Sequence, residues 1–196
     1  MKPAAPDYAL IEQARQRQPQ AFRKLFEIYK TPVYNFVARM IGSPHDAEDV
    51  VQEVFVKMYH KLATLREARY FTTWMFSIAR NEALNYTRKF RKQKWQTLAG
   101  FETQTHDGHI ETAHPHGPDP ERETAESELQ GKLQEALDAV PEVNRAAFIL
   151  GVLEEYSYKE VAEMLGCSEN NVKSRVFRAR AVMCEKLGPY LRTKQE

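Results

Sequence analysis

Basic side chains that suit contacts with nucleic acid lie on one helix-forming stretch near the C-terminal end of the chain. After Ser168, four cations interrupt an apolar pattern of helical period: Lys173, Arg175, Arg178 and Arg180. Arginine and lysine bond either to guanine edges or to phosphates, and the sequence does not say which. The stretch predicts a DNA-binding helix, and an ordinary solvated basic face is the alternative.

A second candidate is a stripe of uncharged hydrogen-bonding residues on a long, aromatic-rich helix predicted from Phe71 to about Lys94. Its members recur at helical spacing and end in a cation: Thr73, Ser77, Asn81, Asn85 and Arg88. A solvated face would more often carry glutamate and lysine. Asparagine and serine beside aromatic residues, followed by the basic run 88–92, suit unstacked bases and a phosphate backbone.

The elements that position the first group of cations form a helix-turn-helix pattern. Ser157 and Glu160 predict a capping box, Gly166 suits the left-handed end of the first helix, and Ser168 suits the N-cap of the second. The buried stripe of the second helix is predicted at Val172, Val176, Ala179 and Met183. The Gly-Pro pair at 188–189 predicts its end. A helical hairpin without DNA binding has the same glycine turn, so this pattern alone leaves both readings open.

Apolar periodicity predicts helices in the rest of the chain and no strand. Helices are expected over 7–17, from Pro19 to Gly42 with a break or kink at Pro32, and from Pro44, capped by Ser43, to about Leu62. A loop over 64–70 precedes the aromatic-rich helix, and the helical period returns from about Thr124. The predicted fold class is all-α. Two helical domains, residues 7–95 and 124–194, are joined by a flexible linker, residues 96–123, and the second domain contains the helix-turn-helix.

Charge is segregated along the chain, although its formal net charge is only +1. Basic residues outnumber acidic ones by eight to two over 66–94, whereas acidic residues outnumber basic ones by eight to one over 96–130. The distribution of charge along the chain therefore favours a nucleic-acid partner, although the net charge does not. No stretch approaches the apolar length of a membrane helix, and the N-terminus lacks the core of a signal peptide. Cys167 and Cys184 belong to no C-x-x-C pair, so we expect a soluble protein of the cytoplasm.

Catalytic and metal sites have little support in the sequence. No carboxylate pair, nucleophile with its base, or phosphate-binding loop is evident, so we expect no enzyme activity, no cofactor and no small-molecule substrate. The linker contains His106, His109, His114 and His116, but no cysteine lies near them and no helix is predicted to fix a carboxylate beside them. We therefore expect no structural metal site there. A metal-dependent enzyme that uses these histidines is the least favoured hypothesis.

Three segments together resemble a known family. They are SPHDAEDVVQEVFVKMYHKL, RYFTTWMFSIARNEALNYTRKFRK and LDAVPEVNRAAFILGVLEEYSYKEVAEMLGCSENNVKSRVFRARAVM. In this order they resemble a bacterial sigma factor of the small, two-domain extracytoplasmic-function (ECF) type, over nearly the whole chain. The resemblance implies a protein that binds RNA polymerase core and directs it to promoters, with the loose linker in place of the family's intermediate domain.

The resemblance also implies roles for particular residues. One helical face matches the segment that docks on a coiled coil of the largest polymerase subunit: Asp46, Asp49, Gln52 and Glu53. A second set matches the region that opens the minus-ten element and captures a flipped base: Arg69, Tyr70, Phe71, Trp74, Ser77, Asn81, Asn85 and Arg88. A third set matches the helix that reads the minus-thirty-five element: Ser168, Asn171, Lys173, Ser174, Arg175, Phe177, Arg178 and Arg180.

The partners implied by the resemblance are RNA polymerase core, through its coiled coil and flap, promoter DNA and an anti-sigma factor. A flexible linker would permit a compact arrangement that blocks the polymerase and DNA surfaces. The alternative function is a stand-alone regulator that uses only its helix-turn-helix. The face between Asp46 and Leu62 distinguishes the two, because only a sigma factor needs it to bind polymerase.

Overall fold

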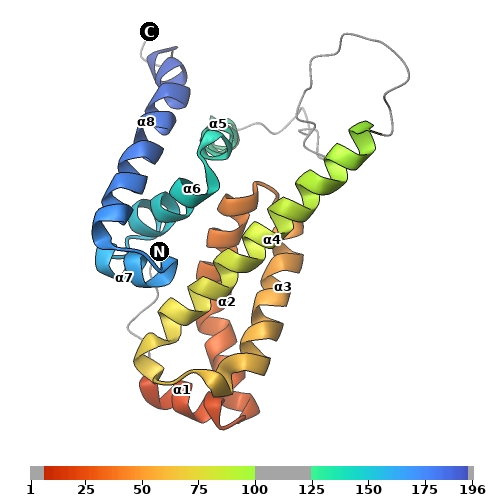
Figure 1. Cartoon of the computed structure of the whole chain (residues 1–196), viewed down its shortest axis with the longest axis vertical. Helices are drawn as coiled ribbons and strands as arrows, with labels where there is room; N and C mark the ends of the chain where they lie inside the picture. The colour runs from red at the N-terminus through yellow and green to blue at the C-terminus, as the bar shows by residue number, and fades with distance from the viewer. Residues whose placement is uncertain (1–6, 100–124, 194–196) are drawn as a thin grey trace.

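Every element that the computed structural model describes is helical (Figure 1). It describes the backbone of residues 7–99 and 125–193, and the side chains of residues 7–90 and 128–191. The first half, residues 7–99, contains α1 (Tyr8–Arg15), α2 (Pro19–Ile41), α3 (Pro44–Lys61), the short 3₁₀ turns η1 (Leu62–Thr64) and η2 (Ala68–Tyr70), and α4 (Phe71–Ala99). The second half, residues 125–193, contains α5 (Ala125–Ala139), α6 (Glu142–Phe148), the π-turn η3 (Ile149–Leu153), α7 (Tyr158–Leu165) and α8 (Glu169–Thr193). This confirms the predicted all-α class.

The core of the first half lies between α2, α3 and α4, which pack side by side above α1 (Figure 1). Each helix contributes the apolar residues of one face, including Val33, Phe36, Val54, Met58 and Met75. The turn from α2 to α3 follows the sequence prediction, because Gly42 has φ +77° and the Ser43 hydroxyl accepts a hydrogen bond from the backbone N–H of Asp46. These short-range signals fix the direction in which α3 leaves α2.

The helix-turn-helix prediction is confirmed by α7 and α8. Ser157 and Glu160 form the capping box, with the Ser157 N–H 2.8 Å from the Glu160 carboxylate. Gly166 has φ +62°, and the Ser168 hydroxyl accepts a hydrogen bond from the N–H of Asn171. All four residues of the predicted stripe are buried: Val172, Val176, Ala179 and Met183. The face of α8 opposite this stripe is exposed, as at Ser174 and Phe177.

Three helix boundaries differ from the sequence prediction. Pro32 lies inside α2, which runs unbroken to Ile41, and Pro189 lies inside α8, which continues to Thr193. A proline inside a helix removes one backbone hydrogen bond, and the turns on each side here continue the helix despite this loss. Helix α4 reaches Ala99, so residues 96–99, assigned to the linker above, are helical. Residues 100–124, the rest of that predicted linker, lie outside the described residues.

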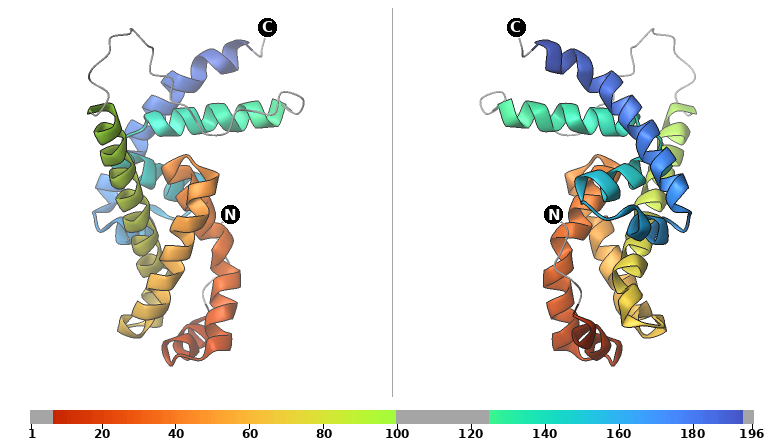
Figure 2. Two further views of the ribbon diagram at one scale, coloured as in Figure 1. Left: turned by 90° about the vertical axis from the view of Figure 1, so that its right-hand side faces the viewer. Right: turned by 90° about the vertical axis from the view of Figure 1, so that its left-hand side faces the viewer.

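The two halves of the chain are in direct contact. Figure 2 shows α5 crossing the end of the first half, near the turn between α2 and α3. Helix α2 contacts α5, α6 and η3, and α4 contacts α7. Rings also meet across this boundary, because Tyr156, which follows η3, packs edge-on against Phe76 of α4 at 5.4 Å between ring centroids. The buried core therefore continues from one half into the other.

Candidate functional site

An exposed ridge runs along α3, and we define the α3 ridge as Asp49, Gln52, Glu53 and Val56. It includes three of the four residues predicted to bind polymerase. The fourth, Asp46, forms hydrogen bonds within the protein. Hydrogen bonds from Ser43, and to a lesser extent from Tyr86, hold the pKa of its carboxyl below the ordinary value. Burial, followed by the bond to Asp46, raises the pKa of the Tyr86 hydroxyl.

Two hollows of different character flank the α3 ridge. Toward α2 lies an apolar groove of about 650 Å³, and its principal lining residues are Phe22, Phe26, Gln52, Phe55, Val56 and Tyr59. Toward α4 lies a smaller, charged hollow of about 340 Å³, lined by Asp49, Glu53, Glu82, Asn85, Tyr86 and Lys89 among others. The ridge thus presents carboxylates on one side and an apolar surface on the other. This apolar groove was not identified from the sequence, although Phe22 and Phe26, four residues apart on α2, are a signal that could have indicated it.

The predicted minus-ten set divides into exposed and buried side chains. Tyr70 is 42% exposed, and the guanidinium of Arg69 lies 4.9 Å from the centre of its ring. Trp74 is partly buried against Phe71. Phe71 itself is 0% exposed and packs on Tyr29, so it supports the core and does not face DNA in this structure. The assignment of Phe71 to the DNA surface is therefore corrected.

The polar stripe of α4 is present, but its two ends face different surroundings. Asn81, Asn85 and Arg88 are exposed, and Asn81 accepts a hydrogen bond of 3.2 Å from Arg80. Ser77 is partly buried and donates to the backbone carbonyl of Trp74 at 2.6 Å. Thr73 lies 3.5 Å from the Glu163 carboxylate of α7. Only the later part of the stripe is open to a ligand.

The predicted minus-thirty-five residues surround most of α8. By helical geometry, Ser174, Phe177 and Arg178 point most directly away from the buried stripe, and Phe177 is 74% exposed. Lys173 and Arg180 flank this centre on one side, and Asn171 and Arg175 flank it on the other. Arg175 is the only half-buried member of the set, with its Nη1 3.5 Å from the Cys167 sulfur. The hydroxyl of Ser168 is engaged as the N-cap.

Other kinds of site are not visible in the described part of the chain. Among the described side chains, those of residues 7–90 and 128–191, no group of three or more histidine, cysteine, aspartate or glutamate residues is arranged to hold a metal ion. The histidines at 106, 109, 114 and 116 lie outside the described residues. None of the described helices has both the length and the apolar content of a membrane span.

Comparison with known families and sequences gives matches to both halves. The family model described as Sigma-70 region 2 matches residues 25–95, and the one described as Sigma-70, region 4 matches residues 130–183. The chain is 33% identical to the ECF RNA polymerase sigma-E factor of Haemophilus influenzae, over 94% of this chain and 97% of that protein. It is 30% identical to the ECF RNA polymerase sigma factor SigW of Bacillus subtilis, over 90% and 94% of the two chains.

Solved structures of similar fold include two complexes. The sigma factor RpoE in complex with the anti-sigma factor NepR from Bartonella quintana matches with a TM-score of 0.63 and 26% identity, over 85% of this chain and 96% of that one. CnrH in complex with the cytosolic domain of CnrY matches with a TM-score of 0.68 and 24% identity, over 93% and 97% of the chains. At 24% identity, the similarity to CnrH shows a shared fold and nothing further.

Proposed function

The chain belongs to the ECF sigma factors of the sigma-70 family, and we propose that it binds RNA polymerase core and directs it to one class of promoters through three surfaces. Members of this family are transcription initiation factors without catalytic activity of their own. The observation that carries the proposal is the match to both family regions in one chain, together with the exposed α3 ridge. A regulator that used only its helix-turn-helix would not require that ridge.

The polymerase surface of this proposal is the α3 ridge with its apolar groove. Glu53 and Asp49 supply negative charge, and Val56 beside Phe55 and Tyr59 supplies apolar area. Apolar area bordered by charged and polar side chains is common in protein interfaces. We assign a supporting role to Asp46, which positions the first turn of α3 through Ser43 and Tyr86.

The minus-ten surface comprises the exposed members of the predicted set. Tyr70 offers a ring for stacking, and Asn81 and Asn85 offer donors and acceptors for the edge of an extruded base. Arg69 and Arg88 supply charge for the phosphate backbone.

We propose two domains, residues 7–95 and residues 124–194. They are joined by a linker over residues 96–123, of which residues 96–99 continue α4.

The minus-thirty-five surface is the outer part of α8. Its centre at Ser174, Phe177 and Arg178 suits base edges in the major groove, and Lys173 and Arg180 at its flank suit phosphates. This division follows from helix geometry, since the centre of the exposed face enters a groove most deeply.

Replacing Arg178 by alanine is expected to weaken binding to the preferred minus-thirty-five element by about 1–3 kcal/mol, with little effect on unrelated sequences. Lys173→Ala is the matched control, and it should weaken binding to all sequences about equally and reduce the salt dependence. Binding of holoenzyme to duplexes with substituted elements measures both. A uniform loss for Arg178→Ala would assign it to phosphate contacts.

Replacing Asn81 by alanine is expected to slow opening of the minus-ten element about tenfold. Extruding a base costs a few kcal/mol, and the variant would lose one of the hydrogen bonds to the base edge that offset this cost. Asn81 is exposed, so its removal leaves the core intact. Permanganate reactivity of unpaired thymines measures the opening, and Glu27→Ala on the exposed side of α2 is a control. Unchanged opening would remove Asn81 from the DNA surface.

Reconstitution with core polymerase tests the function as a whole. The purified protein should bind core and start transcription at a defined class of promoters, which transcript sequencing would identify. Tight promoter binding by the free protein, without binding to core, would support the stand-alone regulator instead. We also propose control by an anti-sigma factor, supported by the similar fold of the RpoE–NepR complex.

A further inference from the structure

We propose that α1, the first helix of the chain, positions the loop that captures the flipped base of the minus-ten element. We define the capture loop as residues 62–70, which join α3 to α4 through the turns η1 and η2. Its exposed Arg69 and Tyr70 belong to the predicted minus-ten set. The inference rests on the proposed function for the role of the capture loop, whereas the support of this loop by α1 follows from contacts in the structure.

The capture loop has a buried inner side and an exposed outer side. Its inner residues, together with the first residue of α4, are apolar and recur every third position: Leu62, Leu65, Ala68 and Phe71. This spacing matches the three residues per turn of a 3₁₀-helix, which both η1 and η2 adopt. Leu62, Leu65 and Phe71 are 1%, 5% and 0% exposed, and Ala68 is partly buried. The other residues of the loop are exposed, so the loop is anchored from its inner side.

Helix α1 lies at the end of the bundle where α3 ends and α4 begins (Figure 1). It contacts both η1 and η2, and it is their principal neighbour apart from the helices that each turn directly joins. The buried residues of α1 are Leu10, Ile11 and Ala14, and Ile11 is 0% exposed. The inner side of the capture loop and the apolar face of α1 therefore belong to one core.

The position of α1 is itself fixed at both ends. At its N-terminus the Asp7 carboxylate accepts hydrogen bonds from the N–H groups of Ala9 and Leu10, at 2.9 and 3.1 Å. At its C-terminus the chain turns into α2 at Arg17, whose φ of +60° is uncommon for a residue other than glycine. A helix of eight residues is marginal by itself in water, so α1 depends on its cap and on its packing. Loss of either should loosen α1 and leave the bundle of α2, α3 and α4 folded.

Side-chain contacts on the outer side of the capture loop are too weak to hold it in one arrangement. Arg69 pairs with Glu67 at 2.9 Å and lies 4.9 Å from the centre of the Tyr70 ring, but all three side chains are exposed. An exposed ion pair contributes little, and salt screens it further. The buried inner side therefore sets the orientation of Tyr70, and α1 packs against that side.

An ordered loop favours the capture of a base. A mobile loop would have to become ordered when the base arrives, and this loss of freedom would reduce the affinity for the base. Because α1 holds the loop before DNA is bound, the ring of Tyr70 is already placed for stacking. The buried residues of α1 are thus positioning residues that act through the loop. The principal contacts of α1 are with α2 and the two turns, so binding of core at the α3 ridge should not depend on them.

The mobility of a nitroxide label on the capture loop of the full-length protein tests this support. The label is placed on Arg66→Cys, with Cys167 and Cys184 replaced by serine, because Arg66 is exposed and outside the predicted minus-ten set. Ile11→Ala removes buried volume from α1, and Ile11→Val is the matched control that keeps most of it. Asp7→Ala removes the N-cap, and Asp7→Asn keeps it, since asparagine caps helices as well as aspartate does.

The label should be more mobile in Ile11→Ala and Asp7→Ala than in the parent protein and the two controls. The second readout is capture by holoenzyme of a single-stranded oligonucleotide, which carries the non-template minus-ten sequence of a promoter identified by transcript sequencing. Its affinity should fall about tenfold for Ile11→Ala and about threefold for Asp7→Ala, with binding to core polymerase unchanged. The losses should not add in Ile11→Ala/Tyr70→Ala, because α1 acts through the loop that carries Tyr70.

An equally immobile label in all variants would overturn the support of the capture loop by α1. A mobile loop with capture at the parent level, or additive losses in the double variant, would overturn its positioning role. If Ile11→Ala also loses binding to core, its fold is disturbed, and the two variants of the exposed Asp7 decide the question. A parent protein that binds neither core nor, in its presence, the oligonucleotide would overturn the proposed function, while the mobility of the label would still test the support by α1.

Discussion

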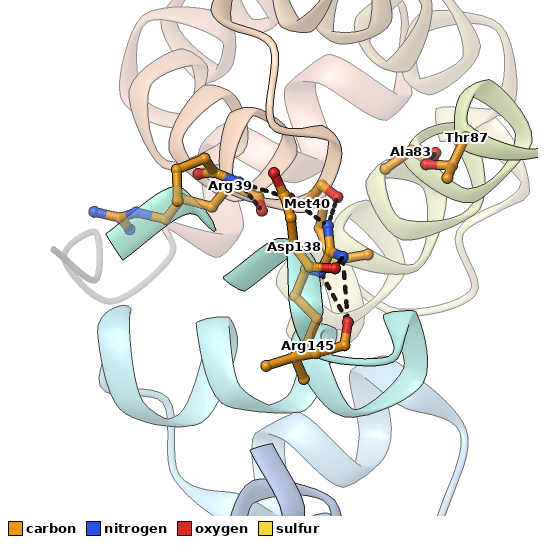
Figure 3. Close-up of polar contacts among 8 residues, drawn as sticks. Arg39, Met40, Ala83, Thr87, Asp138 and Arg145 are labelled. Carbon is orange, nitrogen blue, oxygen red and sulfur yellow. Dashed lines mark hydrogen bonds and ion pairs between the residues drawn. The ribbon is translucent and has the colours of Figure 1, made fainter. Parts of the chain in front are cut away.

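Replacing Arg145 by leucine should lower the free energy of unfolding by about 3–5 kcal/mol. Arg145 is 6% exposed and donates to the backbone carbonyls of Met40, Asp138 and Val140, as well as to the Asp138 carboxylate (Figure 3). Leucine fills much of the same space but donates no hydrogen bond. The carbonyls would then lose their buried donor, which costs about 1–3 kcal/mol for each group that finds no substitute.

Chemical denaturation followed by circular dichroism measures this change. Arg23→Leu is the control, because Arg23 is exposed on α2 and its replacement should alter stability by less than about 0.5 kcal/mol. Most of this loss of stability should arise where α5 ends and the chain turns into α6, because the carbonyls of Asp138 and Val140 lie there. A loss below about 1 kcal/mol for Arg145→Leu would show that water or other side chains replace its hydrogen bonds.

The double substitution Gln52→Ala/Glu53→Ala should weaken binding to core polymerase about 100-fold, equivalent to about 2.7 kcal/mol. Both side chains are exposed on the α3 ridge, where Gln52 borders the apolar groove and Glu53 borders the charged hollow. Their removal would take polar contacts from both sides of one interface. The buried face of α3 would stay intact, so the fold and its thermal unfolding should be unchanged.

Fluorescence anisotropy with labelled protein and core polymerase measures this affinity. Glu12→Ala is a suitable control, because Glu12 is an exposed carboxylate of α1 that lies outside the α3 ridge and forms an ion pair with Arg15. A surface pair of this kind contributes little. Wild-type affinity of the double variant would contradict the assignment of the α3 ridge to polymerase.

Features that depend on a few neighbouring residues were predictable from the sequence. The capping box at Ser157, the left-handed Gly166 and the Ser43 cap were all found as expected. The predicted buried stripe of α8 was also correct. In each case the geometry follows from local hydrogen bonding and from helical periodicity, which act over one or two turns. Family motifs then assigned the surfaces, since three of them occur in one order.

Local rules were insufficient where backbone signals conflicted or where exposure had to be decided. Pro32 and Pro189 suggested interruptions, but the helices continue through both. Phe71 and Tyr70 are adjacent aromatic residues, yet one is fully buried and the other is 42% exposed. Their difference depends on how α4 packs against α2, where Phe71 meets Tyr29. Periodicity places residues on a face of a helix, and only packing decides what covers that face.

The sequence by itself determined the helices, the helix-turn-helix and the family, because these depend on local hydrogen bonds, periodicity and motif order. Only the tertiary structure decided that Arg39 of α2 and Arg80 of α4 join the two halves. Arg39 and Glu154 are 115 residues apart, and Arg80 meets the carbonyl of Leu165 across 85 residues. No local pattern encodes such pairs, because each requires two distant segments of the chain to meet in space. Arg80, one of the basic residues over 66–94 that suggested nucleic acid, therefore also contacts the second half of the chain.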